Sequence, residues 1–238
     1  MKVTALFISD VHLGSKGSNS KELLSVLKLY EPEHLFIVGD FIDGWLLKKR
    51  HYWTQEYTNV IRKILSYSKN GTKVHYITGN HDEFLREYTP LSMAENIEIV
   101  DELVWNDYYV THGDLYDGVV QLKWLGHLGS VGYEIAIIID RAMKKFGYRR
   151  SLSKWLKDKV KGAVKFITSF EKQLLFQAEK RNCKGVICGH IHTPAMYADK
   201  KGIQYINCGD WVENNSFIVY INDEFKMKFY NEDNQDKL

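Results

Sequence analysis

The chain has 238 residues, of which 45% are hydrophobic and 26% are charged, a composition typical of globular proteins. This apolar content excludes an intrinsically disordered chain, and the length predicts one large domain, or one domain with a sizeable insertion. No apolar stretch approaches the roughly 18 residues of a membrane-spanning helix. Three cysteines without a Cys-x-x-Cys pair argue against a disulfide framework and a structural zinc site, and predict a reducing compartment, the cytoplasm.

Positive charge is concentrated in one segment of the chain. The net charge is only +2, but residues 141–165 carry ten Lys or Arg and a single acid, Asp158. Such asymmetry predicts a surface that binds an anionic partner. A solvated helix face would carry the same charges, and this alternative stays open.

Short apolar runs predict buried strands, and helical patterns lie between the early ones. The predicted strands are residues 3–8, 34–38, 74–77, 108–110, 185–188 and 204–206. The first run ends at Asp10 without a small-residue cleavage site, so we interpret it as a strand and not a signal peptide. Apolar spacing predicts one helix capped by Ser20 and another over about residues 53–67. This alternation predicts an α/β fold with a largely parallel interior, and residues 217–230 predict a final hairpin.

The segment from about residue 117 to 181 has no strand alternation. Apolar residues recur every three or four positions from Leu152 to Ala178, which predicts a long helix capped by Ser151 or Ser153. We interpret this segment as a helical insertion in a single domain that covers residues 1–238.

Five polar clusters follow apolar runs, where the predicted strands end. They are Asp10–His12, Gly39–Asp40, Gly79–Asp82, His112–Asp114 and Gly189–His192. Ligands of α/β sheets gather beyond the carboxyl ends of the strands, and residues two apart on an extended chain point to the same side. Asp10 and His12 can therefore reach one metal ion together, as can His190 and His192. Burying so many imidazoles and carboxylates without a metal would leave costly unpaired groups.

The donor set combines carboxylate, imidazole and amide groups. This mixture suits Mn, Fe or Zn better than Ca or Mg, which prefer oxygen ligands alone. Two such ions, about 3.5–4 Å apart, would clamp an in-line phosphoryl displacement. The clusters therefore predict a metal site, and two ions held there would suit phosphoryl chemistry.

The combined series Asp-x-His, Gly-Asp, Gly-Asn-His, His-Gly-Asp and Gly-His-x-His resembles the calcineurin-like metallophosphoesterase superfamily. The resemblance extends from Asp10 to His192. It implies a four-layer α/β/β/α sandwich of two mixed sheets, and two divalent metal ions, with Mn expected and Fe or Zn as alternatives. The implied ligands of one ion are Asp10, His12, Asp40 and His192. Asp40 would bridge to the second ion, which Asn80, His112 and His190 would also hold.

Two further residues acquire catalytic roles through this resemblance. His81 would protonate or stabilise the leaving oxygen, and Asp43 would orient it. An Asp–His pair stabilises the imidazolium form through its opposite charge. A surface turn would also explain an acid at Asp43.

Within the superfamily, the chain resembles the UDP-2,3-diacylglucosamine hydrolase group of lipid A biosynthesis. The matching segments are residues 40–45, 79–85, 112–114 and 189–195. This resemblance implies a lid in the insertion that receives acyl chains, a nucleotide-linked lipid substrate, and contact with the inner membrane surface. Basic residues would neutralise the diphosphate or anionic lipids. The implied substrate-binding residues are Trp45, Arg149, Arg150, Lys154 and Lys157.

One residue departs from this group, whose members carry Arg where this chain has His81. Arg is a fixed cation and cannot act as a general acid, so a related enzyme that cleaves another diphosphate or a phosphodiester is an alternative. A soluble phosphodiesterase or nuclease and a non-catalytic scaffold are the others. Nucleic acid is the less expected partner, because the basic segment has few aromatic residues. The sequence predicts no oligomeric state.

Overall fold

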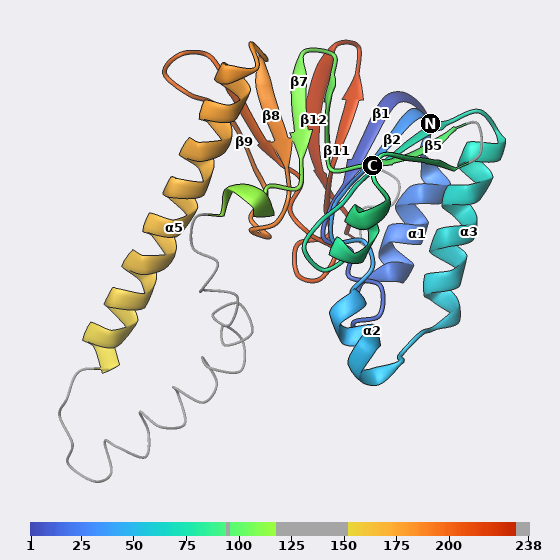
Figure 1. Ribbon diagram of the computed structural model, residues 1–238, viewed down its shortest axis with the longest axis horizontal. Helices are drawn as coiled ribbons and strands as arrows, with labels where there is room; N and C mark the ends of the chain where they lie inside the picture. Colours follow the sequence, from blue (N-terminus) through green and yellow to red (C-terminus); the bar gives the residue numbers. More distant parts are fainter. Residues whose placement is uncertain (94–95, 118–151, 232–238) are drawn as a thin grey trace, which may run out of the picture. The chain divides into compact units, whose positions relative to one another are not determined.

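The computed structural model describes residues 1–93, 96–117 and 152–231 (Figure 1). Its helices are α1 (Ser20–Leu29), α2 (Gly44–Arg50), α3 (Gln55–Lys69), α5 (Leu152–Lys180), and the 3-10 helices η1 (Glu83–Tyr88) and η2 (Asp114–Tyr116). Its strands are β1 (Lys2–Ile8), β2 (Glu31–Val38), β3 (Lys73–Ile77), β4 (Leu91–Met93), β5 (Ile97–Val100), β6 (Glu102–Trp105), β7 (Tyr108–Thr111), β8 (Gly185–Cys188), β9 (Ala195–Ala198), β10 (Gln204–Asn207), β11 (Ser216–Ile221) and β12 (Glu224–Phe229).

The chain divides into two compact units. Residues 1–115 and 174–238 form the first, and residues 116–173 form the second. Within the described ranges, no helix is long and apolar enough to cross a membrane. Both sheets and every described metal-ligand candidate belong to the first unit.

Two mixed sheets form the centre of the first unit. The seven-stranded sheet has the order β12-β11-β1-β2-β3-β5-β4, and the five-stranded sheet has the order β6-β7-β8-β10-β9. Strands β1, β2, β3 and β5 pair in parallel, as do β7, β8 and β10. Antiparallel strands complete both edges of each sheet. The parallel strands bring the carboxyl ends of β1–β3 to one end of their sheet, and those of β7 and β8 to one end of the other.

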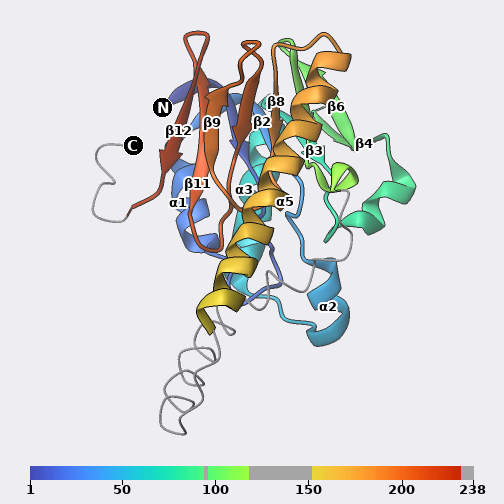
Figure 2. The same cartoon turned by 90° about the vertical axis from the view of Figure 1, so that its left-hand side faces the viewer.

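Apolar side chains join the layers. The inner faces of the two sheets share a core that includes Phe7, Val38, Val110 and Ile187. The other face of the seven-stranded sheet packs against α1 and α3, so β1 is buried on both faces and reads as a continuous apolar run. The last two turns of α5, in which Leu174 and Ala178 are fully buried, lie along the outer face of the five-stranded sheet (Figure 1 and Figure 2). The expected four-layer sandwich is confirmed.

Most predicted elements are present, with one wrong detail and several omissions. All six predicted strands form, and the final hairpin is β11–β12. Ser20 does not cap α1: the helix starts there, and Asn19 stands at its cap without a side-chain bond to it. The side-chain amide of Asn19 instead donates to Val212 O (3.1 Å) and Asn215 Oδ1 (2.7 Å). The pattern also missed α2, β4, β5, β6 and β9.

The insertion is described only in part. Its long helix is α5, which starts at Leu152, next to the serines proposed to cap it. Residues 118–151 lie outside the described residues, so the single-domain assignment and the lid remain predictions.

A histidine pair lies in the middle of two neighbouring strands, β2 and β3. His34 on β2 and His75 on β3 have nearly parallel rings, with His34 Nδ1 2.9 Å from His75 Nε2. Because His75 Nδ1 also bonds the carboxylate of Glu98, which only accepts, His75 Nε2 accepts the proton of His34. Burial, followed by His75 and Lys73, lowers the pKa of His34; burial also lowers that of His75, although Glu98 opposes the shift.

We expect this pair to make folding stability dependent on pH. A lowered pKa means that the unfolded chain binds protons first, so the pair stabilises the fold above about pH 6.5 and loses this contribution as the pH falls. We expect the free energy of unfolding of a His34→Gln/His75→Gln variant to depend less on pH between about 6.5 and 5 than that of the original chain. Urea unfolding across this range checks the difference, and replacing the exposed His51 by Gln is the control. Equal slopes in all three proteins would contradict it.

Candidate metal centre

The five polar clusters predicted from the sequence meet at the carboxyl ends of strands from both sheets. Asp10 and His12 follow β1, Asp40 follows β2, and Asn80 follows β3. From the five-stranded sheet, His112 follows β7, and His190 and His192 follow β8. Ligand side chains of α/β proteins gather at this position. Six of these seven residues, together with Asp43 and His81, fall into three groups whose donor atoms lie within 4.8 Å of one another.

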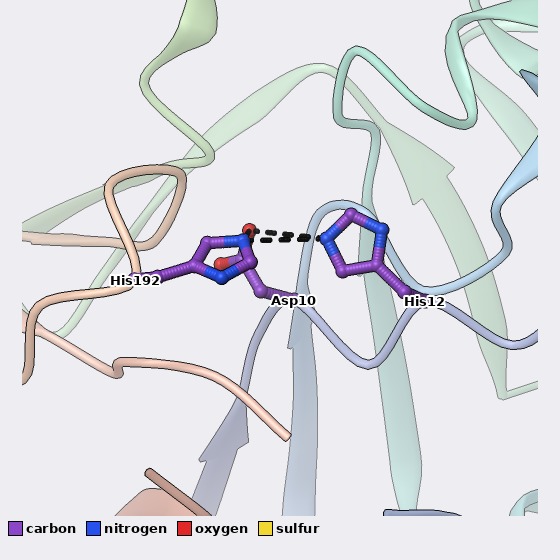
Figure 3. A group of neighbouring side chains, drawn as sticks. All are labelled: Asp10, His12 and His192. Atoms are coloured by element: carbon purple, nitrogen blue, oxygen red, sulfur yellow. Dashed lines mark hydrogen bonds and ion pairs between the residues drawn. The ribbon is translucent and has the colours of Figure 1, made fainter. Parts of the chain in front are cut away.

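The first group consists of Asp10, His12 and His192. Figure 3 shows their side chains pointing toward one another, two from the loop after β1 and one from the loop after β8. Nε2 of His192 lies 3.1 Å from Asp10 Oδ1 and 3.3 Å from His12 Nε2. Burial alone would raise the pKa of Asp10, but His192 and His112 lower it to about 2. The carboxylate is therefore ionised at neutral pH, the form that a metal requires.

The second group consists of Asp40, His112 and His190. Fully buried His112 approaches the carbonyl of Val38 with Nδ1 (2.9 Å), which fixes its ring and directs Nε2 to within 3.3 Å of Asp40 Oδ2. The same Asp40 oxygen lies 3.9 Å from His12 Nε2. Burial would raise the pKa of Asp40, but His112 holds it far below its usual range. Asp40 thus stands between the two groups.

The backbone of these residues is strained. Five of the seven predicted ligands have positive φ angles, +51° at Asp10 and His12, +50° at Asp40, +72° at His190 and +51° at His192. Residues other than glycine seldom adopt this conformation, and such strain concentrates at functional sites. Glycines allow the same loops to approach each other, because a Cβ at Gly79 would lie 2.2 Å from Asp40 Oδ1 and one at Gly189 2.5 Å from Asp10 Oδ2.

The arrangement fits divalent metal ions. Oδ1 of Asn80 and Nε2 of His112 are buried, and neither makes a hydrogen bond within the described part of the chain. An unpaired buried acceptor costs about 1–3 kcal/mol, and coordination to a cation would satisfy both atoms. Carboxylates, imidazoles and an amide oxygen form the mixed donor set of Mn, Fe or Zn. The candidate ligands of the family therefore stand together in space.

The third group contains the two predicted catalytic residues. Asp43 is buried at the N-cap of α2, where its Oδ1 accepts from Leu46 N (2.9 Å). That oxygen is 3.2 Å from His81 Nδ1, and Oδ2 is 3.4 Å from His12 Nδ1. Burial would lower the pKa of His81, but the bond to Asp43 outweighs it and raises the pKa. The pair therefore favours the imidazolium form of His81.

Trp45 is the one predicted substrate-binding residue whose side chain is described. Its ring lies 4.3 Å from that of His81, centre to centre, and its Nε1 donates to Glu83 Oε1 (3.1 Å). The structure therefore places Trp45 beside the Asp43–His81 pair. Arg149 and Arg150 lie outside the described residues. Lys154 and Lys157 belong to α5, but their side chains are also outside the description.

Three residues that support the site were given no role from the sequence, although Asp82 belongs to the predicted cluster Gly79–Asp82. Asp82 is buried and accepts from Phe41 N (2.9 Å) and Tyr76 Oη (2.6 Å), which ties the loop after β3 to the loop after β2. Arg86 binds Asp114 through two nitrogens, at 2.9 and 2.8 Å, next to the His112 loop. Asp210 follows β10 in the pair Gly209-Asp210, which repeats the pattern Gly39-Asp40 after another apolar run. This repetition in the sequence could have identified Asp210.

Comparison with known proteins finds one matching family and several similar proteins. Residues 3–194 match the calcineurin-like phosphoesterase family. A UDP-2,3-diacylglucosamine hydrolase from Marinobacter nauticus is 26% identical over 229 residues, which cover 89% of this chain and 91% of that enzyme. One from Porphyromonas gingivalis is 27% identical over 124 residues, 48% of this chain and 47% of that enzyme. A solved dimetal phosphatase from Danio rerio has a TM-score of 0.47 and 16% identity, and covers 95% of this chain and 96% of its own.

The family match spans most of the chain and contains all five polar clusters. Curated relatives along nearly the whole chain are named as hydrolases. The chain is therefore a phosphoesterase that belongs to the calcineurin-like phosphoesterase family.

Proposed function

We propose that this enzyme is a dinuclear-metal-dependent pyrophosphohydrolase similar to the UDP-2,3-diacylglucosamine hydrolases, which releases UMP and a lipid-sugar phosphate. The observation that carries the proposal is the convergence of six of the seven proposed ligands, from both sheets, beside the Asp43–His81 pair. The names of relatives that match over about nine-tenths of their length supply the substrate class. The proposed location is the cytoplasm, at the inner membrane surface.

The proposed ligands fall into two sets that share Asp40. One set is Asp10, His12, Asp40 and His192, and the other is Asp40, Asn80, His112 and His190. Two divalent ions, for which Mn is proposed, would polarise the phosphoryl oxygens and lower the pKa of an attacking water. The ionised carboxylates of Asp10 and Asp40 support this assignment.

The proposed role of His81 is to protonate the leaving oxygen. Asp43 holds the imidazolium at Nδ1, which leaves Nε2 as the nitrogen that can donate a proton to the substrate. The Trp45 ring lies against the same imidazole and offers a flat apolar surface to the part of the substrate that departs.

His81 also favours a second candidate function, because an imidazole replaces the Arg expected in lipid A hydrolases. A general acid assists poor leaving groups, including the sugar alkoxides of ordinary phosphodiesters. A soluble phosphodiesterase or nuclease is therefore the alternative. A nuclease that uses the basic segment would show a steep dependence of DNA affinity on salt concentration.

A substrate panel separates these functions. Purified enzyme with Mn is incubated with acylated and non-acylated UDP-sugars, a CDP-lipid, bis(p-nitrophenyl) phosphate and single-stranded DNA, and the products are separated chromatographically. The proposal predicts UMP from the acylated UDP-sugar at the highest kcat/KM. Cleavage of DNA or the aryl diester with no UMP release would establish the alternative, and no hydrolysis of any substrate would indicate a scaffold.

The proposed role of the basic segment is to bind an anionic lipid substrate. Neutralising Arg149, Arg150, Lys154 and Lys157 should raise KM for such a substrate and leave kcat nearly unchanged, because uniform binding is lost. Rates on a small aryl diester should stay constant, and the effect should shrink at 1 M salt, where the Debye length is roughly 3 Å.

A matched control removes four charges elsewhere. Lys2, Lys21, Lys28 and Lys69 are exposed on β1, α1 and α3, and their neutralisation should change neither constant. Equal losses on both substrates in the basic-segment variant would indicate a structural role for the segment. Unchanged kinetics on both substrates would show that the basic segment is only a solvated helix face.

A further inference from the structure

The loop between β10 and β11 contacts the backbone of two proposed ligands of the same ion. Trp211 N donates to the carbonyl oxygen of Asp10 (3.1 Å), and Asn214 Nδ2 donates to that of His192 (3.0 Å). Asp10 and His192 come from different sheets, and both have a φ of +51°. The loop therefore links the strained backbones of Asp10 and His192, and none of its own residues is a proposed ligand.

Asp210 gives this loop its shape. Its carboxylate is fully buried, and Oδ1 accepts from the backbone nitrogens of Val212 (2.8 Å) and Asn214 (3.3 Å). Its Oδ2 accepts from the side-chain amide of Asn214, the same nitrogen that reaches His192. Because a carboxylate only accepts, this contact fixes the amide with its NH₂ group toward His192.

The hydrogen bond from Asn214 is accepted by the carbonyl of a strained residue, His192. A left-handed residue persists only when its surroundings hold it, since the conformation costs on the order of 1–3 kcal/mol. Removing the amide frees the peptide after His192 to relax, and the imidazole would move with it. Nε2 of His192 now lies 3.1 Å from Asp10 Oδ1, and a movement of about 1 Å would break this arrangement.

We propose that Asn214, held by Asp210, is a positioning residue that sets the affinity of the metal site formed by Asp10, His12 and His192. The inference rests on the metal dependence in the proposed function, but it concerns binding alone and is independent of the substrate.

The test measures Mn²⁺ binding to the metal-free full chain by isothermal titration calorimetry, with free Mn²⁺ followed by electron paramagnetic resonance. Asn214→Leu keeps the approximate shape of the side chain and removes the donor. It should weaken one of two sites about 10–100-fold, the usual effect of losing a group that orients a ligand, and leave the other site unchanged. Asp210→Asn should act in the same direction, because its NH₂ group would replace an acceptor oxygen and face either the amide of Asn214 or the backbone nitrogens of the loop.

The matched control is Asn96→Leu. Asn96 Nδ2 donates to the carbonyl of Ser68 (3.1 Å), so the substitution removes the same kind of hydrogen bond away from the proposed ligands. It should leave both Mn²⁺ affinities unchanged. If Asn214→Leu does not fold, as judged by circular dichroism, Asn214→Ala removes the amide without filling its space.

A double-mutant cycle with His192→Ala decides whether the effect passes through His192. In that background, Asn214→Leu should cause no further loss of Mn²⁺ affinity. Full additivity, equal weakening of both sites, or unchanged binding in Asn214→Leu would overturn the inference. Absence of Mn²⁺ binding to the original chain would instead refute the metal dependence on which the proposed function depends.

Discussion

Replacing Asp40 by alanine is expected to abolish turnover and to reduce bound metal from two ions to one or none. Asp40 is nearly fully buried, and its Oδ2 lies 3.3 Å from His112 Nε2 and 3.9 Å from His12 Nε2. It is the carboxylate proposed to contact both ions, so its removal leaves each site short of a ligand and less able to neutralise the positive charge. Metal analysis of the dialysed protein and hydrolysis of an aryl phosphodiester measure the two effects.

The control for this variant is Asp107→Ala. Asp107 is exposed and forms a surface ion pair with Lys184 (2.8 Å), an interaction typically worth about 0–1 kcal/mol. It should change neither metal content nor turnover. An Asp40→Ala enzyme that keeps both ions, or that retains most of its activity, would refute the bridging role.

Replacing His81 by alanine should slow hydrolysis about 10²–10⁴-fold, the usual contribution of a general acid. Both metal ions should remain, because His81 is not among the proposed ligands. The loss should be smaller for substrates with good leaving groups, which need less protonation. A series of aryl diesters that differ in the pKa of the leaving phenol measures this dependence.

The exposed His51 provides the control for this series, because the His51→Ala variant should hydrolyse every aryl diester at the rate of the original enzyme. Equal losses for poor and good leaving groups in His81→Ala would remove His81 from the role of acid. Loss of a metal ion would show that His12, Asp43 and His81, which also stand within ligand distance of one another, form a binding site.

The sequence predicted the centre of the fold because parallel strands buried on both faces are continuous apolar runs. It missed three of the four edge strands, β4, β6 and β9, for the opposite reason, whereas the edge strand β12 was predicted in the final hairpin. All three residues of β4 are exposed, and β9 is mostly exposed, so neither carries the apolar signal of a buried strand. The prediction that Ser20 caps α1 was wrong, because the cap position is Asn19. The side chain of Asn19 donates to residues nearly 200 positions away in the sequence, and no local pattern reveals such contacts.

The candidate ligands were predictable because each follows a strand. The residues that hold these ligands in place were harder to predict. Asn214 contacts His192 through one hydrogen bond and Asp210 through two, and nothing in the local composition marks it as different from Asn215. Asp210 was within reach of the same rule that identified Asp40, since both follow Gly at the end of an apolar strand.

Titrating the metal-free enzyme with Mn²⁺ while following hydrolysis of bis(p-nitrophenyl) phosphate tests dinuclear metal-dependent hydrolysis most directly. The measurement relates activity to the number of ions bound per chain, without any assumption about the natural substrate. We predict no hydrolysis in the presence of a chelator and full activity only when two equivalents are bound. Full activity of the metal-free enzyme, or saturation of both sites without hydrolysis of this or any other phosphoester, would contradict the account.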